Sequence, residues 1–291
     1  MLDDGDFVDL DWIDASAASG APLLLVLHGL EGSSGSHYVG GLLRGARARG
    51  WRGVALNFRS CGGELNTLPR FYHSGDTGDL DEIVRTLIAR EPDVRLGIVG
   101  ISIGGNVLLK WLGELKAEAP AQVLAAATLS VPFDLTACAG VLDRGFAKLV
   151  YTANFMRTMR RKVAEKARVH PGFVDVAAVR KARTFAVYDT LVTAPLSGFA
   201  DARDYWRRAS SLPYLGAIAR PTLMLNAHDD PFIPPGSLPG PQDLSPHVRL
   251  IVTPRGGHVG FLEGWWPWTA RSWAERRAIE FLADRFPPPL R

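Results

Sequence analysis

The chain has 291 residues, of which 47% are hydrophobic and 22% are charged, and its formal net charge is +3. This composition is ordinary for a globular enzyme and provides ample apolar material for a core, in one large α/β domain or two smaller ones. The charge is too small for this length to indicate a nucleic-acid-binding protein, which would concentrate basic residues beside aromatic ones.

The N-terminal sequence and the cysteines predict a cytoplasmic protein. Residues 1–6 are acidic and lack the basic and apolar regions of a signal peptide. The longest apolar stretches, such as Pro22–Leu27, are far shorter than the ~20 residues that span a bilayer. Cys61 and Cys138 are too few for a disulfide framework and suit a reducing compartment. We therefore expect a soluble protein without stable membrane insertion.

Six short runs of apolar residues have the length of β-strands. Because they are apolar on both faces, they favour a buried parallel sheet that is covered by helices. The runs are Leu23–Leu27, Gly53–Phe58, Val94–Val99, Ala125–Ser130, Thr222–Asn226 and Val248–Val252.

Helical patterns lie between these runs. Apolar residues at positions 80, 83, 84, 87 and 88 form a helical stripe that Asp76 or Thr77 could cap, and residues 107–115 repeat the spacing. The alternation of strand and helix predicts an α/β fold with a mostly parallel, doubly wound sheet.

The alternation stops between Pro132 and about Leu215, where helical patterns occur without a strand-like run. We interpret this stretch as a helical cap inserted between two late strands. It should lie over the carboxyl ends of the strands, where ligands bind in open α/β sheets. The predicted division is a core of residues 1–132 and 216–291 and a cap of residues 133–215.

The segment Gly100–Gly104 has the G-x-S-x-G form of a nucleophile elbow, with Ser102 at its centre. A strand candidate precedes it and a helix candidate follows it, which is the context that the motif requires. The alternative is an ordinary glycine-rich turn; a phosphate-binding loop is disfavoured because no Gly-Lys-Ser/Thr sequence follows. Ser102 would lie at a helix N-terminus, where free N–H groups favour developing negative charge.

A serine nucleophile needs a histidine base and a carboxylate that orients it, in the chain order Ser, Asp or Glu, His. His258 follows the last strand candidate in the glycine-rich segment 256–260. Asp229 and Asp230 both follow the preceding strand. We favour Asp230, because the prolines of its D-P-x-x-P sequence would fix a turn and hold the carboxylate still.

An oxyanion hole needs two N–H donors. We assign them to Ile103, the residue after the nucleophile, and to Leu30, in the loop after the first strand candidate. His28 in that loop is expected to brace it rather than to act as a second base. No histidines or carboxylates have metal-ligand spacing, so we predict no metal and no cofactor.

Seven segments along nearly the whole chain carry a family resemblance. They are His28–Gly32, Asn57–Glu64, Tyr72–Thr77, Gly100–Gly105, Thr193–Phe199, Asn226–Pro234 and Gly256–Phe261. With them the chain resembles the YheT-like branch of the α/β-hydrolase superfamily, which is related to ABHD-type lipid esterases. The resemblance implies an α/β-hydrolase fold with a helical cap, and a serine esterase with Ser102, Asp230 and His258 as its triad. Members often have Arg-Gly-Cys at 59–61 and His-Gly-Phe at 197–199, where this chain has Ser60 and Ser197.

Three other features allow two interpretations each. A basic run in the cap could attract a lipid surface weakly or form a solvated helix face. Four tryptophans after His258 could line an acyl pocket or anchor the last helix. His73 and Asp76 could brace the site, or Asp76 could cap a helix. The run is Arg157, Arg160, Arg161, Lys162, Lys166 and Arg168, and the tryptophans are Trp265, Trp266, Trp268 and Trp273.

The predicted function is hydrolysis of a small-molecule carboxylic ester with a short- to medium-chain acyl group, glycerolipids being one class. Some of the apolar residues in the cap should face such a substrate. The candidates are Phe146, Leu149, Val150, Phe155, Met156 and Met159. One alternative is an acyltransferase or thioesterase with the same triad. Another is a non-catalytic ligand-binding protein on the same scaffold, because fold alone does not fix function. The sequence indicates no nucleic-acid partner and no particular oligomeric state.

Overall fold

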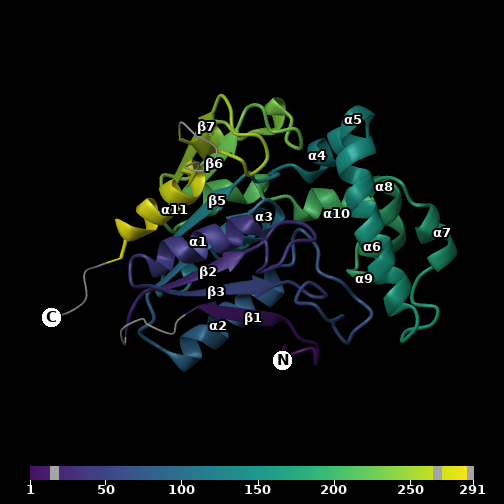
Figure 1. Cartoon of the computed structure of the whole chain (residues 1–291), viewed down its shortest axis with the longest axis horizontal. Coiled ribbons are helices and arrows are strands. Elements are labelled where there is room, and N and C mark those ends of the chain that lie inside the picture. The colour runs from purple at the N-terminus through teal and green to yellow at the C-terminus, as the bar shows by residue number, and fades with distance from the viewer. Residues whose placement is uncertain (14–19, 265–270, 287–291) are drawn as a thin grey trace.

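The computed structural model describes residues 1–13, 20–264 and 271–286 (Figure 1). A seven-stranded sheet has the order β1-β3-β2-β4-β5-β6-β7, and a separate two-stranded sheet pairs β8 with β9. The strands are β1 Asp9–Ile13, β2 Leu23–Leu27, β3 Arg52–Asn57, β4 Leu96–Ile101, β5 Val123–Leu129, β6 Thr222–Ala227, β7 Val248–Thr253, β8 Leu262–Glu263 and β9 Arg271–Ser272.

The strands from β3 to β7 in this order pair in parallel, and β1 pairs with β3 in the antiparallel direction. All six predicted strands are present, with ends shifted by up to two residues. Strands β1, β8 and β9 have no counterpart among the predicted runs. Strand β1 alternates polar and apolar residues because it forms the edge of the sheet and is only half buried.

Helices cover both faces of the sheet because its strands are apolar on both faces. Successive residues of β2 belong to two different clusters: Leu25 packs with α2 (Thr77–Arg90) and α3 (Ile103–Leu115), whereas Val26 packs with α1 (His37–Arg47) and α11 (Trp273–Ala283). The predicted doubly wound arrangement is therefore confirmed. A 3₁₀ turn, η1 (Lys116–Glu118), follows α3.

The cap helices lie between β5 and β6 in sequence and beyond the carboxyl ends of the strands in space, to the right in Figure 1. They have a hydrophobic cluster of their own, which runs from Leu135 to Ala209. We therefore propose the division into a core and a cap of residues 133–215. The cap elements are α4 Leu135–Leu142, α5 Gly145–Ala147, η2 Lys148–Thr152, α6 Ala153–Lys166, α7 Val176–Lys181, α8 Phe185–Tyr188, η3 Asp189–Thr193, α9 Ala194–Leu196 and α10 Ala202–Ala209. The 3₁₀ turn η4 Leu212–Ala217 leads back to the core, where Leu215 packs with α3.

Two details of the cap differ from a regular helical pattern. The turns η2 and η3 are π-helical, and η2 joins α5 to α6, so that helical backbone continues from Gly145 to Lys166. The segment that forms α4 had shown no predicted helix. After β6, the proline-rich loop contains the short 3₁₀ turns η5 (Pro235–Ser237) and η6 (Pro241–Asp243).

Candidate active site

Ser102 occupies the sharp turn between β4 and α3. Its φ is +53°, which an L-residue adopts only at a cost of about 1–2 kcal/mol. The flanking glycines allow this turn because no side chain would fit at either position. A Cβ atom on Gly100 would lie 2.5 Å from the carbonyl oxygen of Gly104, and one on Gly104 would lie 2.5 Å from that of His28. The strand, turn and helix that the motif requires are all present.

His258 lies within hydrogen-bond distance of Ser102, with 3.0 Å between Nε2 and Oγ. Its loop returns sharply over the sheet, because Gly257 and Val259 take φ values of +56° and +59°. The Val259 N–H donates to the hydroxyl of Ser130. The imidazole also stacks on the ring of Phe232, with 4.1 Å between centroids. These contacts orient the ring toward the serine.

Asp230 lies on the other side of the imidazole. Its Oδ2 and Oδ1 are 2.9 and 3.1 Å from His258 Nδ1, and its side chain is fully shielded from solvent. Oδ1 also accepts a hydrogen bond from the Phe232 N–H. Asp230 therefore joins His258 and Ser102 in one hydrogen-bonded row, although 156 residues separate the serine from the histidine.

The neighbouring Asp229 contacts the same loop in a different way. Its Oδ1 accepts hydrogen bonds of 2.8 Å from the backbone N–H groups of Gly256 and Gly257. Asp229 is exposed and holds the histidine loop, whereas Asp230 holds the imidazole. The two candidates that sequence alone left open thus have distinct contacts.

The loop that contains Leu30 passes close to the serine. A Cβ atom on Gly29 would lie 3.2 Å from that of Ser102. Over the described ranges, the N–H groups of Leu30 and Ile103 have no protein acceptor, and both residues line the cavity next to the serine. Both predicted donors are thus free to bind a ligand oxygen.

His28 braces this loop, as expected. Its Nε2 must accept the hydrogen bond from the Phe58 N–H, at 3.1 Å, so Nδ1 carries the proton and donates to Gly29 O at 2.7 Å. Burial lowers the pKa of His28 to about 4, so the ring stays neutral at neutral pH.

A cavity of about 280 Å³ opens above Ser102 and His258, with a predominantly apolar lining from core and cap. Of the six apolar cap candidates, Phe155 and Met159 line it, Met156 is buried in the cap cluster, and Phe146, Leu149 and Val150 are exposed. The other cap residues that line the cavity are Leu135, Cys138, Ala139, Leu142, Phe185, Asp189, Thr193, Tyr205 and Trp206.

His73 and Asp189 also line the cavity. Burial lowers the pKa of His73 to about 3, and its Nδ1 accepts a hydrogen bond from the Gly75 N–H. Burial raises the pKa of Asp189 to about 7, although Thr193 and the indole of Trp206 donate hydrogen bonds to it. Asp189 could not be singled out from the sequence, because its segment shows no periodicity or motif that marks it.

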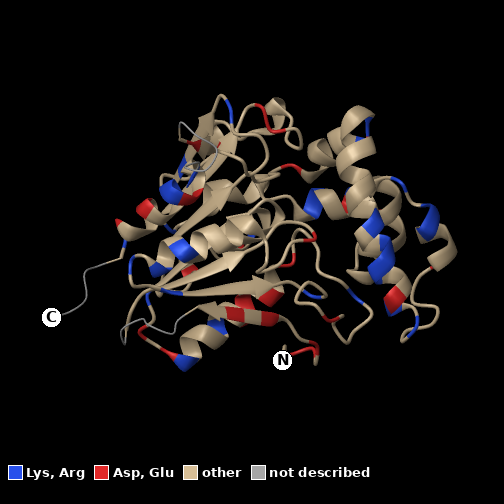
Figure 2. Ribbon diagram, viewed as in Figure 1, with Lys and Arg blue, Asp and Glu red and all other residues tan. Residues whose placement is uncertain are grey.

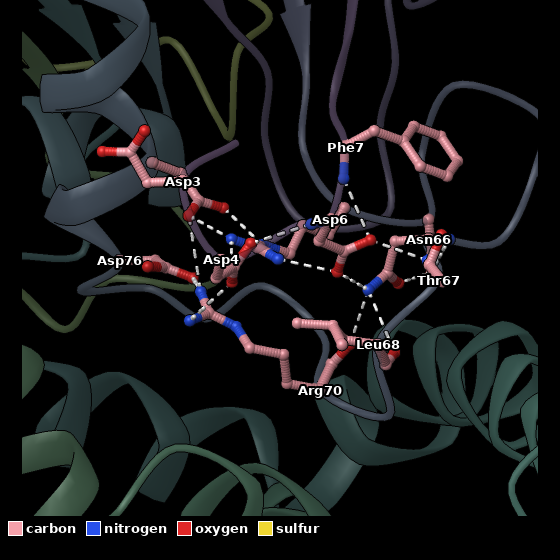
Figure 3. A network of polar contacts seen from close by, with 12 residues as sticks. Asp3, Asp4, Asp6, Phe7, Asn66, Thr67, Leu68, Arg70 and Asp76 are labelled. Atoms are coloured by element: carbon pink, nitrogen blue, oxygen red, sulfur yellow. Dashed lines mark hydrogen bonds and ion pairs between the residues drawn. The ribbon is translucent and has the colours of Figure 1, made fainter. Parts of the chain in front are cut away.

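The loop before α2, which carries His73, is held by a network of charged side chains (Figure 3). The buried Arg59 binds Asp4, Asp6 and Asp79, and Arg70 binds Asp76 at 2.7 Å. Asp76 occupies the N-cap position of α2, but its side chain makes no cap hydrogen bond. The helix-capping interpretation of Asp76 is therefore wrong, because the carboxylate pairs with Arg70 instead.

The basic run of the cap is not one solvated face. Arg157, Arg161 and Arg168 are exposed on or just beyond α6, where Figure 2 shows basic segments. The other three point into the protein: Arg160 donates to backbone carbonyls of the cap, and Lys162 and Lys166 bind groups of the core. Neither predicted interpretation holds for these three.

Trp273 supports the packing interpretation of the tryptophans, since it begins α11 and stacks on Phe261. Trp265, Trp266 and Trp268 lie outside the described residues. Among the residues that the structure describes, no group of His, Cys, Asp and Glu side chains could hold a metal ion. In the same ranges, no helix has the length and apolar character needed to cross a bilayer.

The chain is similar to proteins of known fold. A family model described as the alpha/beta hydrolase fold matches residues 22–264. The putative esterase YheT of Escherichia coli (strain K12) is 41% identical over 90% of this chain and 77% of its own length. Phospholipase ABHD3 of Mus musculus is 33% identical over 91% of this chain and 66% of its own length, so the chain spans just under two thirds of that relative.

A solved structure, the esterase Pf2001 of Pyrococcus furiosus, has a TM-score of 0.61 to this chain at 20% identity. The match covers 98% of this chain and 90% of that chain. At this level of identity the similarity shows a shared fold.

Proposed function

Since this chain belongs to the α/β-hydrolase fold family, we propose that it is a serine carboxylic ester hydrolase with Ser102, His258 and Asp230 as its catalytic triad. Its relatives are named esterase and phospholipase, so the reaction class is ester hydrolysis. The observation that carries the proposal is the row of hydrogen-bond distances, 3.0 Å from Ser102 to His258 and 2.9 Å from His258 to Asp230, at the base of an apolar cavity.

In the first half of the reaction, Ser102 Oγ attacks the carbonyl carbon of the ester and gives its proton to His258 Nε2. Asp230 accepts a hydrogen bond from His258 Nδ1–H, which fixes the tautomer and stabilises the imidazolium. The carbonyl oxygen becomes an oxyanion and accepts hydrogen bonds from the N–H groups of Leu30 and Ile103. His258 then protonates the leaving alcohol as the C–O bond breaks, which gives an acyl-enzyme on Ser102.

In the second half, a water molecule attacks the acyl carbon and gives a proton to His258. The same two N–H groups bind the second oxyanion. When this intermediate collapses, His258 returns the proton to Ser102 Oγ, and the carboxylic acid leaves. Asp230 stays ionised throughout, because its role is to orient and stabilise the imidazole.

The cavity favours a small acyl group. Its volume of about 280 Å³ is near the lower end of ligand pockets, and its lining is mostly apolar. Short- to medium-chain acyl esters, including those of glycerolipids, fit these properties. Arg157 and Arg168, which are exposed on α6 and just beyond it, would also allow weak contact with an anionic lipid surface. Their replacement by Gln should then weaken liposome binding at low salt.

A panel of 4-nitrophenyl esters from acetate to dodecanoate tests the proposal. We expect kcat/KM to be highest for short to medium chains and Ser102→Ala to abolish turnover without loss of fold. Addition of an alcohol acceptor separates hydrolysis from acyl transfer, because a transferase would release the alkyl ester in place of the acid. Wild-type protein that hydrolyses none of the esters, or a Ser102→Ala variant that retains activity, would contradict the proposal.

A further inference from the structure

Glu31, the residue after Leu30, has an unusual backbone conformation. Its φ is +56°, in the left-handed region that residues with a side chain rarely adopt. Such a conformation persists only where neighbouring groups hold it, and strained residues of this kind gather at functional sites. The direction of the Leu30 N–H depends on this turn, because Leu30 and Glu31 are adjacent in the same loop.

Two groups from other parts of the chain hold Glu31. Its N–H donates to the hydroxyl of Tyr72 at 2.7 Å, and the same hydroxyl is 3.3 Å from Glu31 Oε1. Lys162 Nζ donates to Oε1 at 2.8 Å. Tyr72 belongs to the core, but Lys162 lies on the cap helix α6, 131 residues away from Glu31.

The ion pair of Lys162 and Glu31 is largely shielded from water, since the two side chains are 15% and 10% exposed. A pair in this environment loses far more when one partner is removed than a surface pair does, because the other charge stays buried without compensation. Burial lowers the pKa of Lys162, but Cys61 and Glu31 raise it more, so the amine is charged at neutral pH. The Cys61 Sγ atom lies 3.5 Å from Nζ.

The cap helix α6, which carries Lys162, is itself anchored to the core. Lys166, one turn further along α6, is fully buried and donates to Asn66 Oδ1 at 2.6 Å and to Leu68 O at 2.5 Å. The network in Figure 3 holds the same loop through Asn66 and Arg70. Lys166 thus anchors α6 to the core, and the anchored helix presents Lys162 to Glu31.

We propose that Lys162 is a positioning residue: its ion pair with Glu31 holds the turn that directs the Leu30 N–H into the oxyanion hole. The oxyanion hole is therefore complete only when the cap is docked on the core. This inference rests on the proposed reaction at Ser102. A pair that only stabilised the fold would not affect the transition state more than the bound substrate.

The experiment compares Lys162→Met, Glu31→Gln and the double variant with wild type on 4-nitrophenyl butyrate. Arg161→Met is the matched control, because Arg161 is the neighbouring residue on α6 and its side chain is 69% exposed. Lys162→Arg tests rescue by a retained charge. Affinity for a trifluoromethyl ketone provides a second readout, because its adduct with the serine places an oxyanion in the hole. Circular dichroism and Tm report whether each variant is folded.

Removal of one oxyanion donor costs about 10²–10³-fold in kcat, so a misaligned donor should cost less. We expect each single variant to lower kcat by about 10–100-fold, with KM changed less than about threefold and ketone affinity weakened in parallel. The double variant should be no slower than the worse single variant, because both remove the same contact. Arg161→Met should match wild type, and Lys162→Arg should keep most of the activity.

Folded single variants with wild-type kcat, effects that add in the double variant, or a loss confined to KM would overturn the inference and leave the triad proposal standing, because wild type would still hydrolyse the ester. A wild-type protein without ester hydrolysis would overturn both.

Discussion

The sheet core is stabilised mainly by apolar packing, whereas the cap depends more on polar contacts with the core. Strand β2 illustrates the apolar packing: its five residues are at most 2% exposed and pack against helices on both sides. The cap has a smaller apolar cluster, and directed polar contacts tie it to the core. Lys162 and Lys166 provide two of these contacts, and the fully buried Asn106 binds the backbone of Ser74, Ala209 and Ser211.

This difference shows how the candidate site is divided between the two regions. The proposed nucleophile, base and acid all come from loops at the ends of core strands, where burial fixes the backbone. Much of the wall around the substrate cavity, together with Lys162, comes from the cap. Changes in the core should therefore affect the chemistry or the fold strongly, whereas changes in the cap should have smaller and more graded effects.

The largest effect should come from the core carboxylate that binds the imidazole. Asp230→Asn should lower kcat about 10⁴-fold with little change in fold, because the amide favours the wrong histidine tautomer. Asp229→Asn is the matched control, since Asp229 binds only the backbone of the histidine loop. It should cost far less, about tenfold. Steady-state kinetics of both variants test this. A larger loss in Asp229→Asn than in Asp230→Asn would reverse the assignment of the two aspartates.

The next largest effect should follow a change of packing in the core. Gly104→Ala should lower the free energy of unfolding by about 3 kcal/mol or more, because the new Cβ would lie 2.5 and 2.7 Å from two backbone oxygens of His28 and Leu27. Urea unfolding measures the change. A variant as stable as wild type would mean that the close contact of α3 with the oxyanion loop is absent in solution.

In the cap, Asp189 should make stability depend on pH. Burial raises the pKa of Asp189 to about 7 from an ordinary 3.8, so the folded state keeps a proton that the unfolded state has lost. The stabilisation is full below pH 4 and is lost as pH rises through 7. From pH 5 to pH 8, wild type should lose about 2–3 kcal/mol more of its unfolding free energy than Asp189→Asn loses. Urea unfolding at both pH values measures this, and equal pH dependence would contradict it.

The smallest effect is expected at an open position of the cap. Gly140 lies within α4, and no described atom lies within 4 Å of a Cβ atom built on it. Gly140→Ala should raise the free energy of unfolding by about 0.5–1 kcal/mol, because glycine is a poor helix former. Thermal unfolding shows whether the variant is more or less stable than wild type. A fall in Tm would show that the cap is packed at this position as tightly as the core is at Gly104.

The sequence predicts the central sheet well because most of its strands are short, continuous apolar runs between helical patterns. Strand β1 was not predicted, because Asp9 and Asp11 interrupt its apolar residues at an edge of the sheet that is open to solvent. Ser102, His258 and Asp230 could be named because a short motif, a glycine-rich loop and a proline-fixed turn mark them. Resemblance also singled out residue 60, where relatives often have glycine; Ser60 takes a φ of +65°.

The contacts between core and cap could not be predicted. The basic run looked like one charged face, yet Lys162 and Lys166 turn inward to bind Glu31 and Asn66. No local pattern links residues that are 100 or more positions apart. The π-helical turn before α6 also changes which residues face the core, and periodicity assumes a regular helix.

The most direct test of the account is the site of covalent labelling. Protein treated with a fluorophosphonate probe is digested, and the modified peptide is identified by mass spectrometry. We expect one adduct on Ser102, no labelling of Ser102→Ala, and much slower labelling of His258→Ala. A folded wild-type protein that leaves Ser102 unmodified, or a Ser102→Ala variant that is labelled as fast as wild type, would contradict it.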